Sequence, residues 1–441
     1  MTSSLPEWQQ LHQQATIVDL HAHPVFKALL FRRSLTRLVK LPDFLAGELN
    51  PLSVQTSFPN LQAGNVDVLF SAVYPLEKRL FEDIRILGFI PLNIIRRLPF
   101  TLVKQVWNEV IAPPYFTATN TMLDSMEEQV RTYNDNRQSG EREARFARSS
   151  EELERALGEP HQPIIFVHCI EGGHSLEGPV GLRLIDRHWT ELTPAEQDEL
   201  TAEVLANLDA LSERGVAYVV LAHFYPNKLI MPVFPYPEHL ALSLIPRDKL
   251  ENVWHDVSLT LGLTELGRRV VLRMIELGMF VDLSHATPTA RKQVYEIVEA
   301  SGTTRPVVIA THVGAYAINP SPYNLDDWEI KWISQHGGVI GVIFMTYWLM
   351  PYDAKFGLNF ISRTIEHIVN VGGEDVIAIG TDFDGADPPD DIVDESRLPY
   401  LTERLFSEYR ANGARKYSDE QIKKILGGNV LRLLRSGWGM A

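Results

Sequence analysis

Several histidine and carboxylate side chains stand where short apolar runs of this chain end, and their types are those of a metal centre. Imidazoles and carboxylates bind divalent metal ions, and two ions held side by side need one ligand that bridges both. A further carboxylate at such a centre can take a proton from an activated water and pass it to a leaving group. The strand-end residues are His21, Glu171, His223, His285, His312 and Asp382.

The first run ends in an HxH pair, His21 and His23. Side chains two apart on a strand project to the same side, so these two imidazoles could hold one ion together. Glu171 ends another buried run and is followed by two glycines. A buried carboxylate without a partner is costly, so Glu171 needs either a metal ion or a neighbouring Arg or Lys.

His285 and His312 each end an apolar run, in VDLSH and VIATH. One such histidine alone is more often a hydrogen-bonded core residue than a ligand. Together with the HxH pair and Glu171, the two favour a metal centre. Asp382, in GTDFDG, is placed for proton transfer, whereas Asp384 two residues later is expected to act in a turn or as a helix cap.

The elements that would position these residues are eight short apolar runs that alternate with stretches of helical spacing. Such alternation predicts a parallel sheet covered by helices, and helices are expected at 200–215, 264–278 and 289–302. Eight strands favour a closed (β/α)8 TIM barrel, in which the C-terminal strand ends converge on one mouth; an open doubly wound sheet is the alternative. The runs are 16–20, 66–74, 164–170, 216–222, 279–284, 306–311, 338–344 and 376–381.

The chain is interpreted as one barrel domain spanning 1–441, with an insertion at about 76–150 and a long loop at about 225–262 over the barrel mouth. The apolar stretch at 84–95, IRILGFIPLNII, is interrupted by Arg, Gly and Pro and is shorter than the ~20 residues of a membrane span. A lid, a dimer surface or a surface-lying helix is possible there.

Composition narrows the partners. The chain is 45% hydrophobic, which supports a large core, and its 41 basic and 56 acidic residues give a net charge of −15. That charge argues against nucleic-acid or anionic-membrane partners. Cys169 is the single cysteine, so no disulfide framework forms. The first 15 residues lack the features of a secretory signal, and a cytoplasmic location is expected.

The motifs, taken in order, resemble the membrane dipeptidase (renal dipeptidase) family of the amidohydrolase superfamily. They include VDLHAHP, LQAGNVDVLFSAVYP, IEGGHSL, VDLSHAT, THVGAYA and IGTDFDG. The resemblance implies a metal-dependent barrel with two Zn²⁺ ions bridged by Glu171 and a hydroxide, and usually a homodimer. It implies that His21 and His23 bind one ion, that His285 and His312 bind the other, that Asp382 transfers the proton, and that His223 stabilises the oxyanion or orients the substrate carbonyl. For His223, a polar residue that fills the barrel end is the alternative.

The chain departs from the family pattern at three positions. His23 replaces an aspartate of the usual HxD motif, which removes one negative charge. Tyr323, a candidate substrate-binding residue, stands where an arginine that binds the substrate carboxylate is expected, and Ala217 replaces an arginine of the fourth strand. Such an arginine contact is worth about 1.5 to 3 kcal/mol, so another cation, for which Lys228 is a candidate, would have to substitute.

Three hypotheses follow for function. The leading one is a zinc-dependent hydrolase that cuts the amide bond of a dipeptide or dipeptide-like small molecule. The second keeps the binuclear site but changes the substrate to a lactone, an N-acyl amino acid or a modified metabolite without a free carboxylate. The third is a non-hydrolytic binding or tailoring protein on the same barrel.

Overall fold

The computed structural model describes residues 5–37, 53–78, 104–233, 261–350 and 354–439. Eight parallel strands follow one another in the order β2-β1-β9-β8-β7-β6-β5-β4, and β2 pairs with β4 to close the barrel. The predicted (β/α)8 barrel and all eight predicted strands are therefore confirmed. The strands are β1 Ile17–Ala22, β2 Val66–Val73, β4 Ile164–Glu171, β5 Tyr218–Val220, β6 Phe280–Asp282, β7 Val308–Val313, β8 Ile340–Val342 and β9 Ile377–Ile379.

A ninth strand, β3 Ala144–Phe146, was not predicted. It pairs in parallel with the first half of β4, with Ala144 opposite Ile164. That half of β4 is not paired with β5, because β5 pairs only with Ile170 and Glu171. Three residues with a charged one at the centre carry no strand periodicity, so sequence patterning does not detect such an element.

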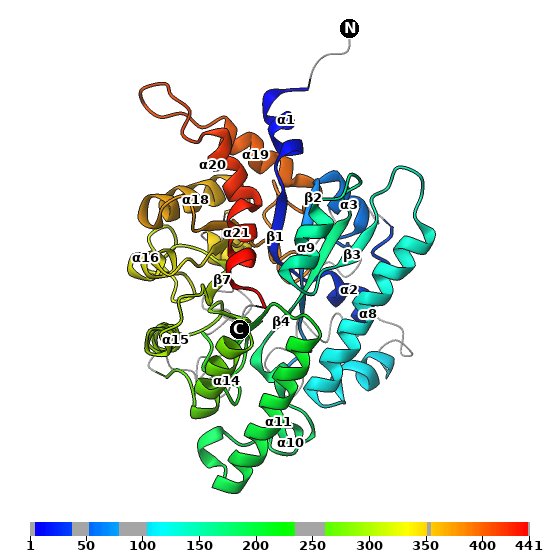
Figure 1. Cartoon of the computed structure of the whole chain (residues 1–441), viewed down its shortest axis with the longest axis vertical. Helices are drawn as coiled ribbons and strands as arrows, with labels where there is room; N and C mark the ends of the chain where they lie inside the picture. The colour runs from blue at the N-terminus through cyan, green and yellow to red at the C-terminus, as the bar shows by residue number, and fades with distance from the viewer. Residues whose placement is uncertain (1–4, 38–52, 79–103, 234–260, 351–353, 440–441) are drawn as a thin grey trace.

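The helices stand around the outside of the barrel (Figure 1). The three predicted helices correspond to α11, α14 and α15; Thr193 and Glu196 form a reciprocal cap at the start of α11, and the left-handed Gly302 ends α15. The α-helices are α1 Glu7–Gln14, α2 Pro24–Phe31, α3 Phe58–Ala63, α8 Tyr115–Asn136, α9 Ser150–Leu157, α10 Pro179–Arg183, α11 Pro194–Glu213, α14 Glu265–Glu276, α15 Pro288–Ser301, α16 Asp327–Gln335, α17 Thr346–Leu349, α18 Leu358–Gly372, α19 Leu398–Phe406, α20 Asp419–Lys423 and α21 Asn429–Gly437.

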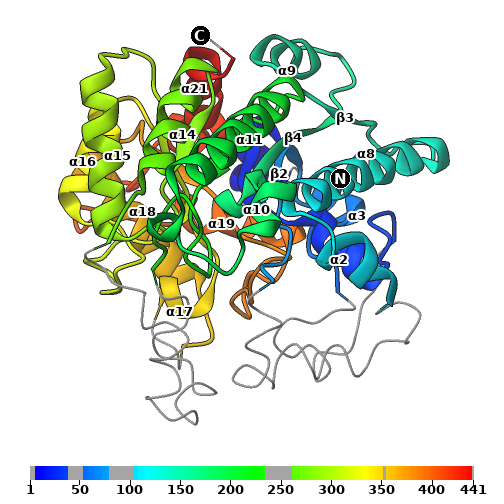
Figure 2. The ribbon, with the colours of Figure 1, turned by 90° about the horizontal axis from the view of Figure 1, so that it is seen from below.

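The strands separate two apolar layers. Along β4, Ile165 and Val167 belong to the cluster inside the barrel, whereas Ile164 and Phe166 belong to the cluster shared with the helices. Leu153 of α9 and residues of α21 also belong to the inner cluster, so these helices fill one end of the barrel. In Figure 2, α9 and α21 lie at the end opposite to α2 and α17, which follow β1 and β8 directly. The C-terminal strand ends therefore form the other end, the mouth.

Two strands carry an irregularity beside a histidine. The pairing register of β1 shifts between residues 19 and 22, and that of β7 shifts between residues 310 and 313. In each case the strand advances by three residues while its neighbour advances by two, which is the pattern of a β-bulge. A bulge changes the direction in which the side chains at that point project. His21 and His312 lie in these two segments, and both are fully buried.

Parts of the predicted insertion and loop lie outside the described residues, including the whole apolar stretch at 84–95 and positions 234–260. The described part of the insertion holds a π-helical turn at Trp107–Ile111, then α8 and β3. Within the described ranges, every helix is too short or too polar to cross a bilayer.

Candidate active site

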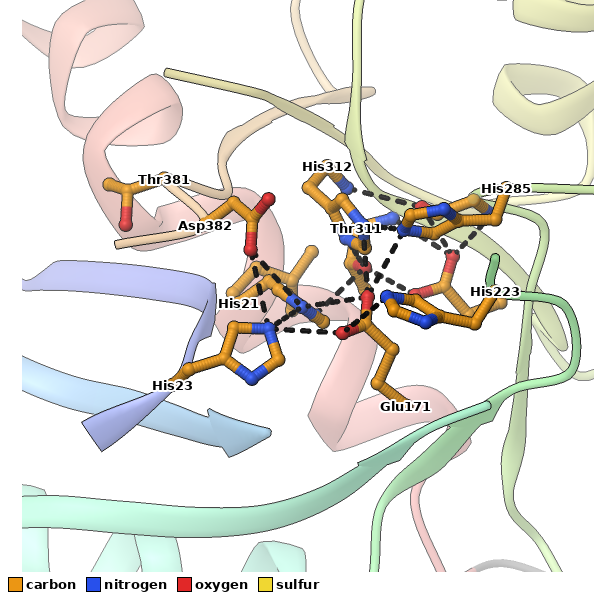
Figure 3. A network of polar contacts seen from close by, with 12 residues as sticks. His21, His23, Glu171, His223, His285, Thr311, His312, Thr381 and Asp382 are labelled. Atoms are coloured by element: carbon orange, nitrogen blue, oxygen red, sulfur yellow. Dashed lines mark hydrogen bonds and ion pairs between the residues drawn. The ribbon is translucent and has the colours of Figure 1, made fainter. Parts of the chain in front are cut away.

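Four imidazoles from three strand ends surround the carboxylate of Glu171 at the barrel mouth (Figure 3). All five side chains are buried, with at most 3% of each residue exposed. The shortest distances from an imidazole Nε2 atom to a Glu171 oxygen are 3.3 Å for His21, 3.1 Å for His23, 3.2 Å for His285 and 3.3 Å for His312. The structure thus brings together all five residues that the sequence analysis named as metal ligands.

The five residues divide into two groups that share Glu171. His21 and His23 form one group with it, and His285 and His312 form the other; within each group the ligand atoms lie within 4.8 Å of one another. The paired Nε2 atoms are 3.1 Å apart in the first group and 2.9 Å apart in the second. One carboxylate with two oxygens between two histidine pairs is the donor set that a bridged pair of divalent ions requires.

The polar atoms of Glu171 and His23 test whether a cation fits this donor set. Glu171 Oε1 is buried and, among the described residues, has no hydrogen bond of good geometry, although three imidazole nitrogens lie within 3.3 Å of it. Nδ1 of His23 is also buried without a described partner, but Nε2 is the atom of this ring that faces Glu171, so Nδ1 does not belong to the donor set. Buried polar atoms are normally satisfied, so an unsatisfied Glu171 oxygen faced by three imidazole nitrogens fits a metal centre.

Burial and neighbouring charges set the protonation states needed for metal binding. Burial lowers the pKa of His21 to about 4 and that of His285 to about 3, which keeps both imidazoles neutral. Burial raises the pKa of Glu171, but the positive potential of the neighbouring histidines outweighs it and holds that pKa well below its usual range. For His21, His285 and Glu171 these are the metal-binding forms. Burial lowers the pKa of His312, but Glu171 and Asp382 raise it above its ordinary value, so a metal ion would have to displace a proton there.

His23 and Asp382 form an ion pair at the edge of the group. Asp382 Oδ1 lies 3.3 Å from His23 Nε2. Burial lowers the pKa of His23, but the neighbouring Glu171 and Asp382 outweigh burial and raise that pKa to about 10. Burial raises the pKa of Asp382, but the hydrogen bond to His23 outweighs burial and holds that pKa below its ordinary value. Asp382 is 7% exposed and has a left-handed backbone, with φ of 60°, as does His285, with φ of 65°. Such strained positions cluster at functional sites.

A layer of polar groups beneath the histidines fixes which ring nitrogen faces Glu171. The Tyr218 hydroxyl donates to the carbonyl oxygen of Leu20 (2.8 Å) and lies 2.9 Å from His21 Nδ1, so it accepts the proton of that nitrogen. The Thr311 hydroxyl donates to Asp282 and lies 2.8 Å from Nδ1 of His312. Both arrangements place the proton on Nδ1 and leave the Nε2 lone pair for a metal ion.

The sequence analysis did not assign Tyr218, Thr311 or Asp282 a role. Thr311 directly precedes a candidate ligand and Asp282 stands three residues before another, so a search for hydrogen-bonding residues just upstream of each histidine could have found them. No sequence pattern marks Tyr218, because β5 and β1 are not neighbours in the sheet and only closure of the barrel brings Tyr218 to His21.

His223, the remaining catalytic candidate, also reaches the group. Its Nε2 atom lies 3.5 Å from Glu171 Oε2, and its Nδ1 atom lies 3.1 Å from the buried carboxylate of Glu77. Asp384 has the turn position expected of it, and its carboxylate accepts hydrogen bonds from the backbone N–H groups of Gln55 and Thr56 and pairs with Lys27 at 3.0 Å.

Two of the positions that depart from the family pattern, Tyr323 and Ala217, and the candidate cation Lys228 have different surroundings. The Tyr323 hydroxyl donates to the carbonyl oxygen of His312 (2.7 Å), and its ring stacks on Trp348 with centroids 3.7 Å apart. Ala217 is buried inside the barrel. Lys228 is buried, and its Nζ atom donates to the carbonyl oxygen of Ile185 (3.3 Å).

Comparison with known proteins agrees with this geometry. The model of the membrane dipeptidase family (peptidase family M19) matches residues 192–437. An uncharacterized protein in the pqqA 5′ region of Klebsiella pneumoniae is 36% identical over 180 residues, which are 40% of this chain and 62% of that protein. Human dipeptidase 3 is 30% identical over 175 residues, which are 40% of this chain and 33% of that protein.

A solved structure has the same fold along almost the whole chain. It is a metallo peptidase from Rhodobacter sphaeroides, liganded with a phosphinate mimic of the dipeptide L-Ala-D-Ala; it superposes with a TM-score of 0.63, at 21% identity, over 96% of this chain and 99% of that one. The family match covers more than half of the 441 residues. This chain belongs to the membrane dipeptidase family, peptidase family M19.

Proposed function

We propose that this protein is a zinc-dependent hydrolase that cleaves the amide bond of a dipeptide or dipeptide-like small molecule. The observation that carries the proposal is the pair of three-residue groups that share Glu171. His21 and His23 would hold one Zn²⁺ ion, His285 and His312 the other, and Glu171 would bridge them. When bound, the two ions supply an activated water and polarise the scissile carbonyl.

Asp382 is the proposed proton carrier. Its carboxylate is buried at the rim of the group and is kept ionised by His23. An ionised carboxylate can accept a proton from the attacking water and then donate that proton to the leaving amine nitrogen. The proposed role of His223 is to stabilise the negative oxygen of the tetrahedral intermediate, because its Nε2 atom faces Glu171.

The second candidate is the same centre acting on a substrate without a free carboxylate. The position of Tyr323 favours it: this buried residue, whose hydroxyl donates to the carbonyl oxygen of His312, supplies no cation where the family pattern has one. Against it stands the solved relative of the same fold, which holds a mimic of L-Ala-D-Ala. Substrate binding by Tyr323 stays a prediction.

Turnover by the zinc-loaded protein separates these candidates. The substrates are matched L,L and L,D dipeptides, each with a free and with a capped C-terminus. Asp382→Asn serves as the blank, and Asp209→Asn, a surface carboxylate paired with Arg273, serves as the matched control. Cleavage of the free forms alone supports the dipeptidase; cleavage of the capped forms supports the second candidate; no cleavage, or full activity of Asp382→Asn, refutes the hydrolytic proposal.

The proposal extends to the whole chain as one catalytic domain. A homodimer and a cytoplasmic location stay predictions. Sedimentation of the purified protein tests the dimer, since two copies have twice the mass of 49.9 kDa.

A further inference from the structure

Glu77 is a buried carboxylate beside the site that the proposed reaction leaves without a role. It follows β2, is 3% exposed, and uses both of its oxygens. Oε2 accepts from the Tyr74 hydroxyl (3.0 Å) and lies 3.1 Å from His223 Nδ1, while Oε1 accepts from the backbone N–H of Tyr225 (2.9 Å). This carboxylate is therefore fixed by three donors from two segments of the chain.

The imidazole of His223 lies between two carboxylates. Nδ1 faces Glu77 at 3.1 Å, and Nε2 faces Glu171 at 3.5 Å. An ionised carboxylate only accepts hydrogen bonds, so Nδ1 must carry a proton and the ring cannot turn over without losing this bond. The ring also packs against Tyr74 and Phe224, with centroids 4.1 Å and 3.8 Å away, which limits its tilt.

We propose that Glu77 is a positioning residue, which holds the His223 ring with a proton on Nδ1 and with Nε2 directed at the centre around Glu171. This inference rests on the proposed hydrolytic function and adds a residue through which His223 acts. Carboxylates that orient a histidine in this way fix both the tautomer and the ring plane.

Glu77→Gln tests the inference with little change in shape. Because the Tyr225 N–H still needs an acceptor, the single amide oxygen must face it, and the amide NH₂ group must then face His223 Nδ1. That contact is satisfied only if the amide donates to Nδ1, so Nδ1 cannot carry a proton in this variant. The ring can then no longer be the doubly protonated imidazolium, which donates to Glu77 through Nδ1 and to the oxyanion through Nε2. We expect kcat to fall about 10- to 100-fold, while KM and zinc content stay within about 3-fold of wild type.

Glu127→Gln is the matched control. Glu127 Oε1 lies 3.3 Å from Nε2 of His168, a residue of β4 that points away from the centre, so this variant removes a second carboxylate–histidine contact. Its kcat should equal that of wild type. The inference would be overturned if kcat of Glu127→Gln fell as far as kcat of Glu77→Gln, or if Glu77→Gln lost its zinc.

A double-mutant cycle asks whether Glu77 acts through His223. If it does, Glu77→Gln should lower kcat by less than about 2-fold in a His223→Asn background, because the group that it positions is gone. A loss as large as in the wild-type background would mean that Glu77 acts independently of His223, which contradicts the inference.

The nitrogen NMR spectrum of ¹⁵N-histidine-labelled protein gives a readout that needs no turnover. The signals of His223 are those missing from the His223→Asn variant. We expect a protonated Nδ1 in the wild type and an unprotonated Nδ1 in Glu77→Gln. Unchanged His223 signals in Glu77→Gln overturn the positioning role. Absence of any amide hydrolysis by the wild type refutes the proposed function instead, and the spectrum still decides the role of Glu77.

Discussion

At the scale of single residues, the centre combines one shared carboxylate, Glu171, with four imidazoles. His23 stands where the family pattern has an aspartate, and its Nε2 atom is 3.1 Å from Glu171 and 3.3 Å from Asp382. An imidazole supplies a nitrogen ligand but no negative charge, so the proposed centre would depend on Glu171 and Asp382 to balance the charge of its two ions.

Removal of the His23 imidazole should therefore empty one half of the centre. His23→Ala leaves only His21 and Glu171 in the first group, and we expect its zinc content to fall from about two ions to about one per chain. His23→Asp supplies a carboxylate instead and should keep both. His367, which is partly exposed and pairs with Asp327 at 2.7 Å, gives the control His367→Ala. Elemental analysis of dialysed protein measures the result, and two ions retained in His23→Ala would contradict it.

Residue types and their positions at strand ends were enough to predict which side chains meet at Glu171. They could not predict the groups that hold them. Tyr218 and Glu77 reach His21 and His223 across the barrel, over 197 and 146 residues of sequence. Contacts of this kind depend on the closure of the sheet, and no local pattern records them.

At the scale of elements, two β-bulges turn histidines toward the mouth. Simple alternation would place Asp19 on the same face as His21, but the bulge lies between them. The Asp19 carboxylate instead accepts from the backbone N–H of Thr381 (3.0 Å) in the segment before Asp382. The sequence predicted the strands because their apolar runs are periodic; the bulges interrupt that period by one residue and leave no signal in it.

Two glycines make room for the bulge of β7. A Cβ atom on Gly341 or on Gly380 would overlap the carbonyl oxygen of Thr311. Gly341→Ala should therefore displace the segment that carries His312, lower the free energy of unfolding by about 1 to 3 kcal/mol, and weaken zinc binding. Urea unfolding and zinc titration measure both effects.

The matched control for Gly341→Ala is Gly158→Ala, at the end of α9. A Cβ atom there would make only ordinary contacts of 3.5 Å or more, and φ is −83°. Its stability should equal or exceed that of wild type. Equal stability and zinc affinity in both variants would show that close approach at Gly341 is unimportant.

At the scale of the whole molecule, His12 joins segments far apart in the sequence. Its Nδ1 atom lies 2.7 Å from the Thr402 hydroxyl of α19, and its Nε2 atom donates to the carbonyl oxygen of Gly64 (2.9 Å). Both ring nitrogens of the neutral form are therefore satisfied. Burial lowers the pKa of His12 below its ordinary 6.5.

This lowered pKa predicts a loss of stability in acid. Below pH 6.5 the unfolded chain binds a proton at His12 that the folded chain does not, so falling pH favours unfolding by up to about 1.4 kcal/mol per pH unit until the folded pKa is reached. His12→Gln lacks this term. We expect the stability advantage of wild type over the variant to shrink between pH 8 and pH 5.5 in urea unfolding. An advantage that is constant with pH, or grows in acid, would be inconsistent with a neutral buried His12.

The central claim is that the barrel mouth is a two-metal hydrolytic centre, and one titration tests it most directly. Zinc is added stepwise to metal-free protein, and the initial rate of amino acid release from the matched dipeptides is followed. The account predicts negligible release without zinc and a plateau at about two equivalents per chain. Release that is independent of zinc, or no release at any zinc concentration, would contradict it.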